Sequence, residues 1–225
     1  MEKIILSGKD IKKSYKMSKK NVIQALDGAD IEVKEGDFTA IVGPSGCGKS
    51  TLMHIAGLLD RPDSGTLIID GVDTAKMKEK QATKFRSKKI GFIFQGFNLI
   101  PTLTALENVM LAGKYSGMKR SAKKTRAEEL LKLVGLEERM YHKPNELSGG
   151  QSQRVAIARS LMNEPALILA DEPTGELDSK TSLEIIDILK KLNKENKQTF
   201  LIVTHNNDVA EACNNIIKLR DGKNA

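Results

Sequence analysis

The feature of this sequence that most limits its fold is a glycine-rich run with the pattern G-x-x-x-x-G-K-[ST], namely Gly43-Pro44-Ser45-Gly46-Cys47-Gly48-Lys49-Ser50. An apolar segment, residues 38–42, precedes the run, and a helical pattern over residues 51–59 follows it. The glycines let backbone N–H groups curl around an anion, and the helix directs its positive end at the same anion. Lys49 offers a charge to the β- and γ-phosphates of a nucleotide, and the Ser50 hydroxyl is a suitable Mg²⁺ ligand. The run therefore predicts a nucleotide site in a strand–loop–helix unit.

Apolar runs alternate with helical patterns along most of the chain, which predicts an α/β fold with a largely parallel sheet. Several runs are continuously apolar, as in strands that helices cover on both faces. Helical stripes are expected over residues 127–134, closed by Gly135, and over residues 183–192. Strands are expected over residues 4–7, 31–33, 38–42, 66–70, 90–94, 167–170, 199–203 and 216–219.

The segment from about residue 97 to residue 145 differs from its flanks, because its pattern is helical and it lacks a convincing strand. We interpret it as a helical insert between two halves of an α/β core. A solvated helix face accounts for its basic run, and contact with lipid or a partner is the alternative. The basic run consists of Lys119, Arg120, Lys123, Lys124 and Arg126.

Composition excludes several other classes of protein. No stretch approaches the roughly 18 apolar residues of a membrane span, and two cysteines exclude a disulfide scaffold and a four-cysteine zinc site. The N-terminus lacks the apolar segment of a secretory signal, so a cytoplasmic location is expected. The net charge of +7 favours an anionic partner, but six phenylalanines, three tyrosines and no tryptophan offer few platforms for single-stranded nucleic acid.

Two adjacent acids, Asp171 and Glu172, end the buried-type strand at residues 167–170. The carboxyl end of a strand in an open α/β sheet reaches the ligand crevice, and successive residues of an extended chain face opposite ways. One carboxylate is therefore expected to bind the Mg²⁺ shell, while the other holds or deprotonates a water near the γ-phosphate. The alternative is a strand that simply ends in solvated acids.

A second anion-binding turn is expected at residues 147–151, before a strongly patterned helix over residues 151–162. Ser148 is expected to cap this helix, and Gly149 and Gly150 expose backbone N–H groups at its positive end. Two phosphate-binding helix ends in one chain need an explanation.

Taken together, these motifs resemble those of the nucleotide-binding subunits of ATP-binding cassette (ABC) transporters over nearly the whole chain. Residues 43–50 match the phosphate loop of that family, residues 147–151 its signature, and residues 169–172 its strand for magnesium and the catalytic base. Gln95 matches the glutamine loop, residues 176–178 the D-loop, His205 the switch histidine and Tyr15 the adenine-stacking aromatic. All seven occur in the order of the family and at suitable spacing.

The resemblance implies a single domain over residues 1–225 with a P-loop NTPase core. Residues 1–95 and 159–225 would form this ATP-binding core, which has a mainly parallel sheet and an N-terminal antiparallel β part. A helical subdomain over about residues 96–158 would carry the signature. The resemblance further implies that two copies pair head to tail, so that each ATP lies between Lys49 of one chain and the turn at residues 148–150 of the other.

The family also implies a role for each site residue. Glu172 would polarise or deprotonate the attacking water, His205 would bond the γ-phosphate and steady Glu172, and Lys49 would stabilise the transferring phosphoryl group. Gln95 would contact Mg²⁺ or the water and act as a hinge to the helical insert. The implied Mg²⁺ ligands are Ser50, Gln95 and Asp171, and the implied ATP-binding residues are Tyr15, Gly43, Pro44, Ser45, Gly46, Cys47, Gly48, Lys49, Ser50, Thr51, Ser148, Gly149, Gly150, Gln151 and Asp178. The alternatives are a core aromatic for Tyr15 and a surface amide for Gln95.

A finer resemblance lies in residues 95–101, 104–109 and 170–175, which are similar to the subfamily of lipoprotein release, macrolide export and antimicrobial-peptide resistance. Two residues depart from its pattern: Glu176 stands where a small residue is usual, and Ser152 replaces a longer polar residue. This subfamily implies ATP, Mg²⁺, an ATP-dependent homodimer and an integral-membrane permease that holds the chain at the inner face of the cell membrane.

Three other functions compete with the permease-coupled ATPase. A soluble ABC ATPase acting on nucleic acid or ribosomes fits the positive charge, but the long coiled coils, zinc modules or tandem cassettes of such proteins are not found, so no nucleic-acid partner is expected. A regulatory module could use ATP occupancy to recruit a membrane partner. A P-loop small-molecule kinase would leave the turn at residues 147–151 without a purpose. The cargo cannot be predicted from these residues.

Overall fold

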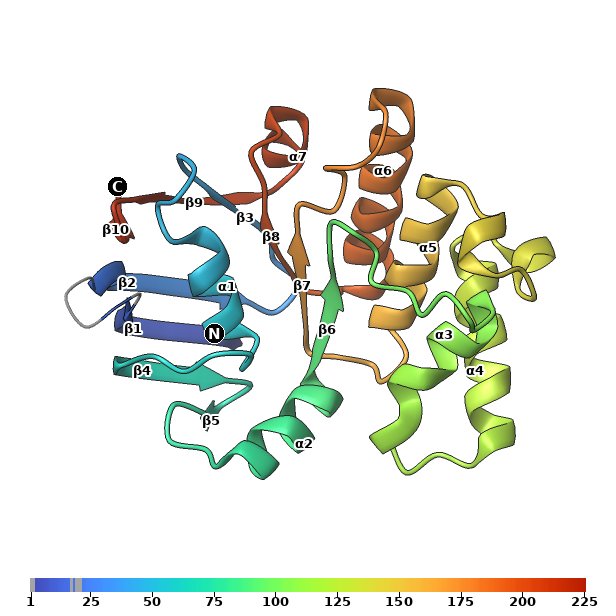
Figure 1. Ribbon diagram of the computed structural model, residues 1–225, viewed down its shortest axis with the longest axis horizontal. Helices are drawn as coiled ribbons and strands as arrows, with labels where there is room; N and C mark the ends of the chain where they lie inside the picture. Colours follow the sequence, from blue (N-terminus) through green and yellow to red (C-terminus); the bar gives the residue numbers. More distant parts are fainter. Residues whose placement is uncertain (1–2, 17, 19–21) are drawn as a thin grey trace.

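The computed structural model describes residues 3–16, 18 and 22–225 (Figure 1). The strands of the first half are β1 (Ile4–Lys16), β2 (Val22–Lys34), β3 (Phe38–Val42), β4 (Ser64–Ile69), β5 (Val72–Asp73) and β6 (Ile90–Ile93), and those of the second half are β7 (Leu167–Asp171), β8 (Phe200–Val203), β9 (Asn215–Arg220) and β10 (Lys223–Asn224). The α-helices are α1 (Lys49–Ala56), α2 (Glu79–Lys89), α3 (Ala105–Ala112), α4 (Arg120–Leu133), α5 (Gly149–Ser160), α6 (Ser179–Asn196) and α7 (Asn207–Glu211), and the 3₁₀ turns are η1 (Gly113–Tyr115), η2 (Glu137–Arg139) and η3 (Pro144–Glu146).

A mainly parallel sheet forms the centre of the molecule, as the sequence predicts. Its strand order is β10-β9-β3-β8-β7-β6, and every neighbouring pair from β9 to β6 is parallel. Strands β7 and β8 are buried along nearly their whole length because helices cover both faces, which explains their uninterrupted apolar sequences. The parallel order places the carboxyl ends of β3, β8, β7 and β6 along one edge of this sheet.

A second sheet is antiparallel, with the order β2-β1-β4-β5, and it contains the N-terminal strands that the resemblance implies. Strands β1 and β2 each span 13 residues, so the shorter predictions at residues 4–7 and 31–33 were wrong in length. Their pairing shifts register at several points, such as between Gly8 and Ile11. These irregularities interrupt the alternation of apolar and polar residues on which the prediction depended.

Two hydrophobic cores lie on opposite faces of the parallel sheet. Helix α1 is packed between one face and the antiparallel sheet, where Leu52 and Ile55 meet Leu6, Val33 and the underside of β8. On the other face, α3, α4, α5 and α6 pack against strand residues such as Phe200 and Ile202. The phosphate loop therefore follows β3 at a position supported from both sheets.

The region between β6 and β7 is helical, and residues 97–145 contain no strand, as predicted. Gly135 has a φ of +73° just after the C-cap Val134, so it ends α4 in the left-handed conformation that the sequence indicates. Helix α2 was missed because Ala82 alone of its residues is buried, which leaves no apolar stripe to detect. Helix α1 begins at Lys49 and ends at Ala56, earlier at both ends than residues 51–59. None of the helices in the described part of the chain is long and apolar enough to cross a membrane.

Candidate nucleotide site

The phosphate loop is shaped by glycines that cannot be replaced without moving backbone. A Cβ atom at Gly43 would lie 2.1 Å from the carbonyl oxygen of Leu219, and one at Gly48 would lie 2.4 Å from the carbonyl oxygen of Ala25. Gly48 also has a φ of +103° and directly precedes α1. The loop is therefore held from outside by β9 and β2, and its curvature is determined by backbone packing.

Lys49 belongs to the first turn of α1, and its side chain folds back over the loop. Its Nζ donates hydrogen bonds of 2.8 Å to the carbonyl oxygens of Gly43 and Pro44. The ammonium group is thereby held above the exposed residues of the loop, among them Ser45 and Gly46. A positive charge, the helix N-terminus and free backbone N–H groups then face the same space, as phosphate binding requires.

Strands β6, β7 and β8 bring the remaining catalytic candidates to the same edge of the sheet as Lys49, which follows β3. Gln95 follows β6, Asp171 and Glu172 end β7, and His205 follows β8, the strand between β7 and β3. The carboxyl ends of neighbouring parallel strands form the usual ligand crevice of such sheets. Gln95 reaches the segment after Glu172, because a Cβ at Gly175 would lie 2.9 Å from its Nε2 atom. The structure thus gathers residues that are far apart in the sequence.

Glu172 and His205 form a direct pair. The Nδ1 atom of His205 lies 2.7 Å from Oε1 of Glu172, and the His205 backbone N–H donates to Oε2 at 3.3 Å. The Glu172 side chain is 16% exposed and that of His205 is 73% exposed. Glu172 has a φ of +45°, an uncommon value for a residue with a long side chain. Strain of this kind is found at functional sites, where the surrounding structure holds a side chain in one orientation.

The surroundings of Asp171 suit the binding of a cation. Burial raises the pKa of its carboxyl group, the charge of Glu172 acts in the same direction, and His54 and Lys49 oppose the shift. The described residues contain no cluster of three or more His, Cys, Asp or Glu side chains that could hold a metal alone. The hydroxyl of Ser50, the amide of Gln95 and the carboxylate of Asp171 are nevertheless the oxygen donors that Mg²⁺ takes when phosphates supply its other ligands. The donor set fits the ion.

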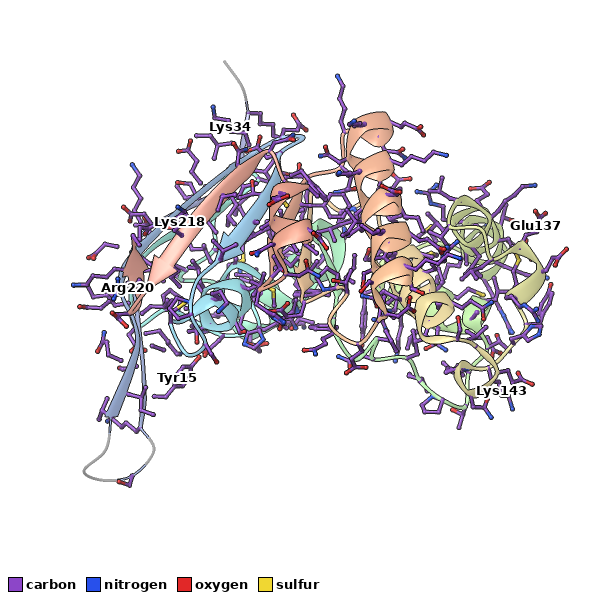
Figure 2. The ribbon with its side chains drawn as sticks, turned by 90° about the horizontal axis from the view of Figure 1, so that it is seen from above. Tyr15, Lys34, Glu137, Lys143, Lys218 and Arg220 are labelled. Carbon is purple, nitrogen blue, oxygen red and sulfur yellow. The ribbon has the colours of Figure 1, made fainter. Side chains whose placement is uncertain are left out.

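Tyr15 lies in strand β1, where it is half-buried. Its hydroxyl donates a 2.7 Å hydrogen bond to Asp60, and Lys13 lies 5.2 Å from the ring centre. Burial and the bond to Asp60 raise the pKa of the phenol, while a hydrogen bond with Thr51 of α1 acts against this shift. Tyr15 is therefore tied to the helix that follows the phosphate loop, and Figure 2 shows it at the opposite end of the molecule from Glu137 and Lys143 of the helical region.

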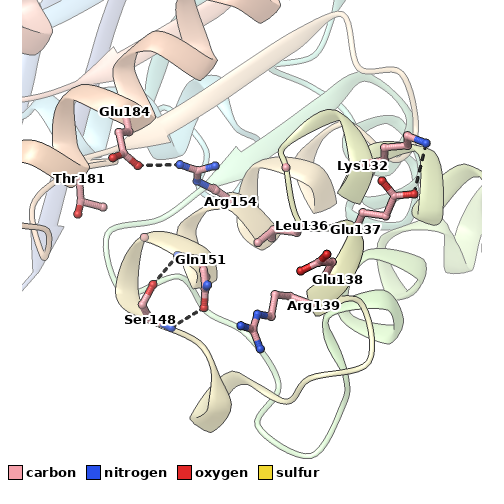
Figure 3. A pocket seen from close by; sticks show the side chains of 12 residues that line it. Lys132, Leu136, Glu137, Glu138, Arg139, Ser148, Gln151, Arg154, Thr181 and Glu184 are labelled. Atoms are coloured by element: carbon pink, nitrogen blue, oxygen red, sulfur yellow. Dashed lines mark hydrogen bonds and ion pairs between the residues drawn. The ribbon is translucent and has the colours of Figure 1, made fainter.

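The signature turn is a capped helix N-terminus, as the sequence predicts. The Ser148 hydroxyl accepts from the Gln151 backbone N–H at 3.2 Å, and the Gln151 side chain accepts from the Ser148 N–H at 3.0 Å. Gly150 packs closely against α6, because a Cβ there would lie 2.4 Å from Cγ2 of Thr181. Figure 3 shows Ser148 and Gln151 beside a cavity of about 560 Å³ that also reaches Arg154 and Glu184.

Asp178 has a local role that the sequence did not reveal. Its carboxylate caps α6 by accepting from the backbone N–H of Thr181 at 3.0 Å and from its hydroxyl at 2.6 Å. These hydrogen bonds lower the pKa of the Asp178 carboxyl group. The nearby carboxylate of Glu176 lies 3.8 Å from where a Cβ of Gly96 would stand, so the segment after Glu172 also faces the segment after β6. Contact of Asp178 with ATP stays a prediction.

One group of predicted residues is not brought to the phosphate loop. Helix α1 and helix α5 lie on opposite sides of strands β7 and β8 (Figure 1). Within the described ranges, no hydrogen bond or ion pair joins residues 148–151 to residues 43–51. In a single copy of the chain the Ser148 turn and the phosphate loop are therefore separate.

Comparison with known proteins decides the family. A family model described as ABC transporter matches residues 26–175. The chain is a member of the ABC transporter family. It is thus an ATP-binding cassette of the ABC type, an ATPase, and the resemblance of its motifs is confirmed.

The relatives of this ABC cassette include a solved dimer and two transport proteins. The ATP-binding cassette MJ0796 of Methanocaldococcus jannaschii, solved as a dimer in a post-hydrolysis state with ADP and Pi, matches with a TM-score of 0.89 and 50% identity over 98% of this chain and 96% of that chain. The lipoprotein-releasing system ATP-binding protein LolD of Bacteroides fragilis is 49% identical over 200 residues, 89% of this chain and 93% of LolD. The macrolide export ATP-binding/permease protein MacB of Bdellovibrio bacteriovorus is 51% identical over 214 residues, 95% of this chain and 32% of MacB. The predicted resemblance to the lipoprotein-release and macrolide-export subfamily is thereby confirmed.

Sequence reasoning missed residues that support the site of this ABC cassette from a distance. Gln153, fully buried in α5, donates a 2.5 Å hydrogen bond to the carbonyl oxygen of Pro173, the residue after Glu172. Arg159, also in α5, donates to the carbonyl oxygens of Phe97 and Asn98. Both contacts join segments that are distant in the chain, and no local sequence pattern predicts them.

Proposed function

We propose that two copies of this chain pair head to tail around two ATP molecules and hydrolyse them. The observation that carries the proposal is the separation of the capped turn at Ser148 from Lys49 in one copy, although both are built to bind phosphate. A second copy, turned by a two-fold axis, brings its own Ser148 turn to the first copy's phosphate loop and completes two equal sites. The dimeric state of the related cassette MJ0796 supports this assembly.

Within each site the residues of this chain have different roles in binding and hydrolysing ATP. Lys49 and the loop N–H groups bind the phosphates and stabilise the charge that develops during transfer. The carboxylate of Glu172, oriented by its bond to His205, orients the attacking water and withdraws its proton. With Nδ1 bonded to Glu172, a His205 ring that carries hydrogens on both nitrogens also donates from Nε2 to the γ-phosphate. Tyr15 and Thr51 bind the nucleoside side of ATP.

Ser50, Asp171 and Gln95 are the residues that would hold Mg²⁺ at this site. When bound, the ion neutralises phosphate charge and orients the γ-phosphoryl group. Burial raises the pKa of the Asp171 carboxyl group, and a neighbouring cation would favour its ionised form. The amide of Gln95 links the ion to the region that follows β6.

We further propose that hydrolysis drives a membrane permease of the lipoprotein-release or macrolide-export type, and that this partner holds the chain at the inner face of the membrane. A groove of about 390 Å³ between α2, β6 and α5 offers the docking surface, with apolar lining from Phe92, Phe94, Ala112 and Tyr115. Tyr115 is 63% exposed. Since Phe94 directly precedes Gln95, an element seated in the groove contacts the catalytic edge. We assign residues 96–158 as the helical subdomain, and residues 1–95 with 159–225 as the core of one ABC domain.

The test uses Glu172→Gln and, as a matched control, Glu211→Gln, which removes an exposed carboxylate on α7. We expect Glu172→Gln to bind ATP with unchanged affinity in calorimetry and to hydrolyse it about 100-fold more slowly. With saturating ATP this variant should elute as a dimer in gel filtration, whereas Lys49→Ala should bind no nucleotide. Unchanged hydrolysis by Glu172→Gln, or a monomer at saturating ATP, contradicts the proposal.

The permease is tested by purifying the tagged chain from its native membrane and identifying the bound subunits. The matched variant Phe94→Glu places a charge in the groove. We expect the wild-type chain to retain an integral-membrane protein of the permease class and Phe94→Glu to lose it. Retention of ribosomes or DNA in place of a membrane protein would favour the alternative assignment.

A further inference from the structure

The segment between β6 and α3 turns on two adjacent residues in the left-handed region. Phe97 has a φ of +59° and Asn98 a φ of +49°. Asparagine tolerates such values, but a bulky residue such as phenylalanine adopts them rarely. The recorded backbone bonds of the turn are local, from Phe97 N–H to the carbonyl of Phe94 (3.2 Å) and from Asn98 N–H to that of Gly96 (2.6 Å). The turn lies directly after Gln95, so its conformation sets where that side chain points.

Arg159, in the last turn of α5, supports this turn from outside. Its Nη2 atom donates to the carbonyl oxygen of Phe97 at 2.8 Å, and its Nη1 atom donates to that of Asn98. The planar guanidinium holds both carbonyls at once, which a lysine ammonium cannot do with the same geometry. Burial lowers the pKa of Arg159. Its hydrogen bonds to side chains and backbone of the described residues go to these two carbonyls and not to a carboxylate.

The far end of the same segment is attached to the helical region as well. Asn108 of α3 is buried, and its Oδ1 atom accepts from the Ile100 N–H at 2.7 Å. Its Nδ2 atom donates to the carbonyl oxygens of Leu103 (3.1 Å) and Thr104 (3.0 Å). Residues 97–104 are thus held by side chains of α3 and α5, whereas Gln95 contacts Gly175 of the core. The junction between the core and the helical subdomain therefore falls at residues 95–96.

We propose that Arg159 is a positioning residue for ATP hydrolysis, which sets Gln95 by holding the turn at Phe97 and Asn98. This inference rests on the proposed function. Helix α5 carries Ser148 at its N-terminus and Arg159 in its last turn, so a movement of the signature turn reaches the segment after Gln95 along one rigid helix. Arg159 and Asn98 also line the groove assigned to the permease. The permease and the signature turn therefore act on Gln95 through the same guanidinium.

The experiment compares Arg159→Met with Arg154→Met in the full chain. Arg154 is the matched control, because it lies on the same helix and also donates to a backbone carbonyl, that of Val134 at 3.3 Å. We expect Arg159→Met to lower kcat about tenfold while the Kd for ATP changes less than about twofold. Hydrogen exchange read by mass spectrometry should show faster exchange over residues 95–100 in Arg159→Met and wild-type exchange there in Arg154→Met.

Arg159→Lys tests the same contact if Arg159→Met folds poorly, and a double variant tests the strain of the turn. Arg159→Lys retains a charge but not the paired geometry, so its kcat should lie between those of the wild type and Arg159→Met. Adding Phe97→Gly to Arg159→Met relieves the left-handed strain at Phe97 and should recover part of the lost kcat. Equal kcat and equal exchange in Arg159→Met and Arg154→Met, or no recovery with Phe97→Gly, would overturn the proposal. Failure of the wild-type chain to bind ATP would instead refute the proposed function. The two outcomes can be told apart, because hydrogen exchange over residues 95–100 is measured without nucleotide and reports on the Arg159 contact alone.

Discussion

The phosphate loop and the signature turn are both glycine-rich in the sequence, but the structure holds them in different ways. In the phosphate loop, Gly43 and Gly48 approach carbonyl oxygens of neighbouring strands, at 2.1 Å and 2.4 Å from an ideal Cβ. In the signature turn, Gly149 and Gly150 face side chains, those of Leu177 and Thr181. Backbone of two sheets thus encloses the first turn, and adjustable side chains surround the second.

This difference bears on how the phosphate loop and the signature turn would serve one reaction. A turn held by backbone keeps its shape whether or not a ligand is present, so the phosphate loop is a preformed cradle. A turn held by side chains of α6 and of nearby loops can shift as part of a helix. We therefore expect the phosphate loop to provide affinity for ATP and the signature turn to respond to it. The following substitutions test that contrast.

The largest effect is expected from Gly48→Ala. The new methyl group would meet the carbonyl oxygen of Ala25 at 2.4 Å, and the residue would have to keep a φ of +103°. We expect a loss of about 3 kcal/mol or more in the free energy of unfolding and a loss of ATP affinity of about 100-fold. Denaturant unfolding and calorimetry measure both quantities.

Gly149→Ala is the control for this substitution. Its methyl group would lie 3.2 Å from Cδ2 of Leu177 and 3.7 Å from Cζ of Phe97, both at the ends of flexible side chains. The free energy of unfolding should change by less than about 1 kcal/mol, and ATP affinity of the single chain should stay as it is. Equal losses from Gly48→Ala and Gly149→Ala would show that the two turns are held alike.

An intermediate effect is expected from Gly150→Ala, because the new methyl group would lie 2.4 Å from Cγ2 of Thr181. Overpacking of this kind costs about 1–3 kcal/mol. The double variant Gly150→Ala/Thr181→Ser removes that methyl group and keeps the hydroxyl that bonds Asp178. Its unfolding free energy and ATP hydrolysis rate should return toward wild-type values. If the double variant is no better than Gly150→Ala, the contact with Thr181 is not the cause of the loss.

A small effect is expected away from both turns, from Asp70→Asn in the turn that follows β4. Hydrogen bonds from Lys3 and Lys89, each 2.7 Å from the carboxylate, lower the pKa of Asp70. Asparagine tolerates the left-handed φ of +46° at this position, so the substitution removes charge and leaves the backbone alone. The lysines are about half exposed, and we expect a loss of about 1 kcal/mol at pH 7.

The pH dependence of this loss follows from the direction of the pKa shift. A carboxyl group whose pKa is lower in the folded chain stabilises the fold above its unfolded pKa and loses that contribution as the pH falls through the folded value. The difference between wild type and Asp70→Asn should therefore shrink below about pH 4. Urea unfolding at pH 7 and pH 3 measures it. A difference that persists unchanged at pH 3 would mean that charge is not responsible.

The sequence predicted the parts of the site that depend on contiguous residues. The phosphate loop follows from one run between β3 and α1, and the Ser148 cap follows from a serine that stands just before a strongly patterned helix. The convergence of Glu172 and His205 was expected because both end buried strands. Strands β1 and β2 were predicted too short, since bulges break their alternation, and α2 was missed because it buries Ala82 alone.

Contacts between distant segments could not be predicted. The hydroxyl of Tyr15 bonds Asp60, 45 residues away, and Arg159 bonds the turn at Phe97, 62 residues away. The first pair depends on how the antiparallel sheet packs against the end of α1, and the second on how α5 packs against the segment after β6. Local periodicity predicts neither arrangement. The left-handed conformation of Glu172 also has no signal in its residue type, because glutamate rarely adopts it.

Mixing two inactive variants shows whether each ATP site combines Lys49 of one copy with Ser148 of another. Lys49→Ala lacks the phosphate-binding charge, and Ser148→Arg blocks the signature turn, so each alone should hydrolyse ATP at a negligible rate. In a one-to-one mixture, mixed dimers contain one site with both groups intact, and about a quarter of all sites are restored. We predict that single-turnover hydrolysis recovers to roughly a quarter of the wild-type amplitude. No recovery at any mixing ratio would contradict the account.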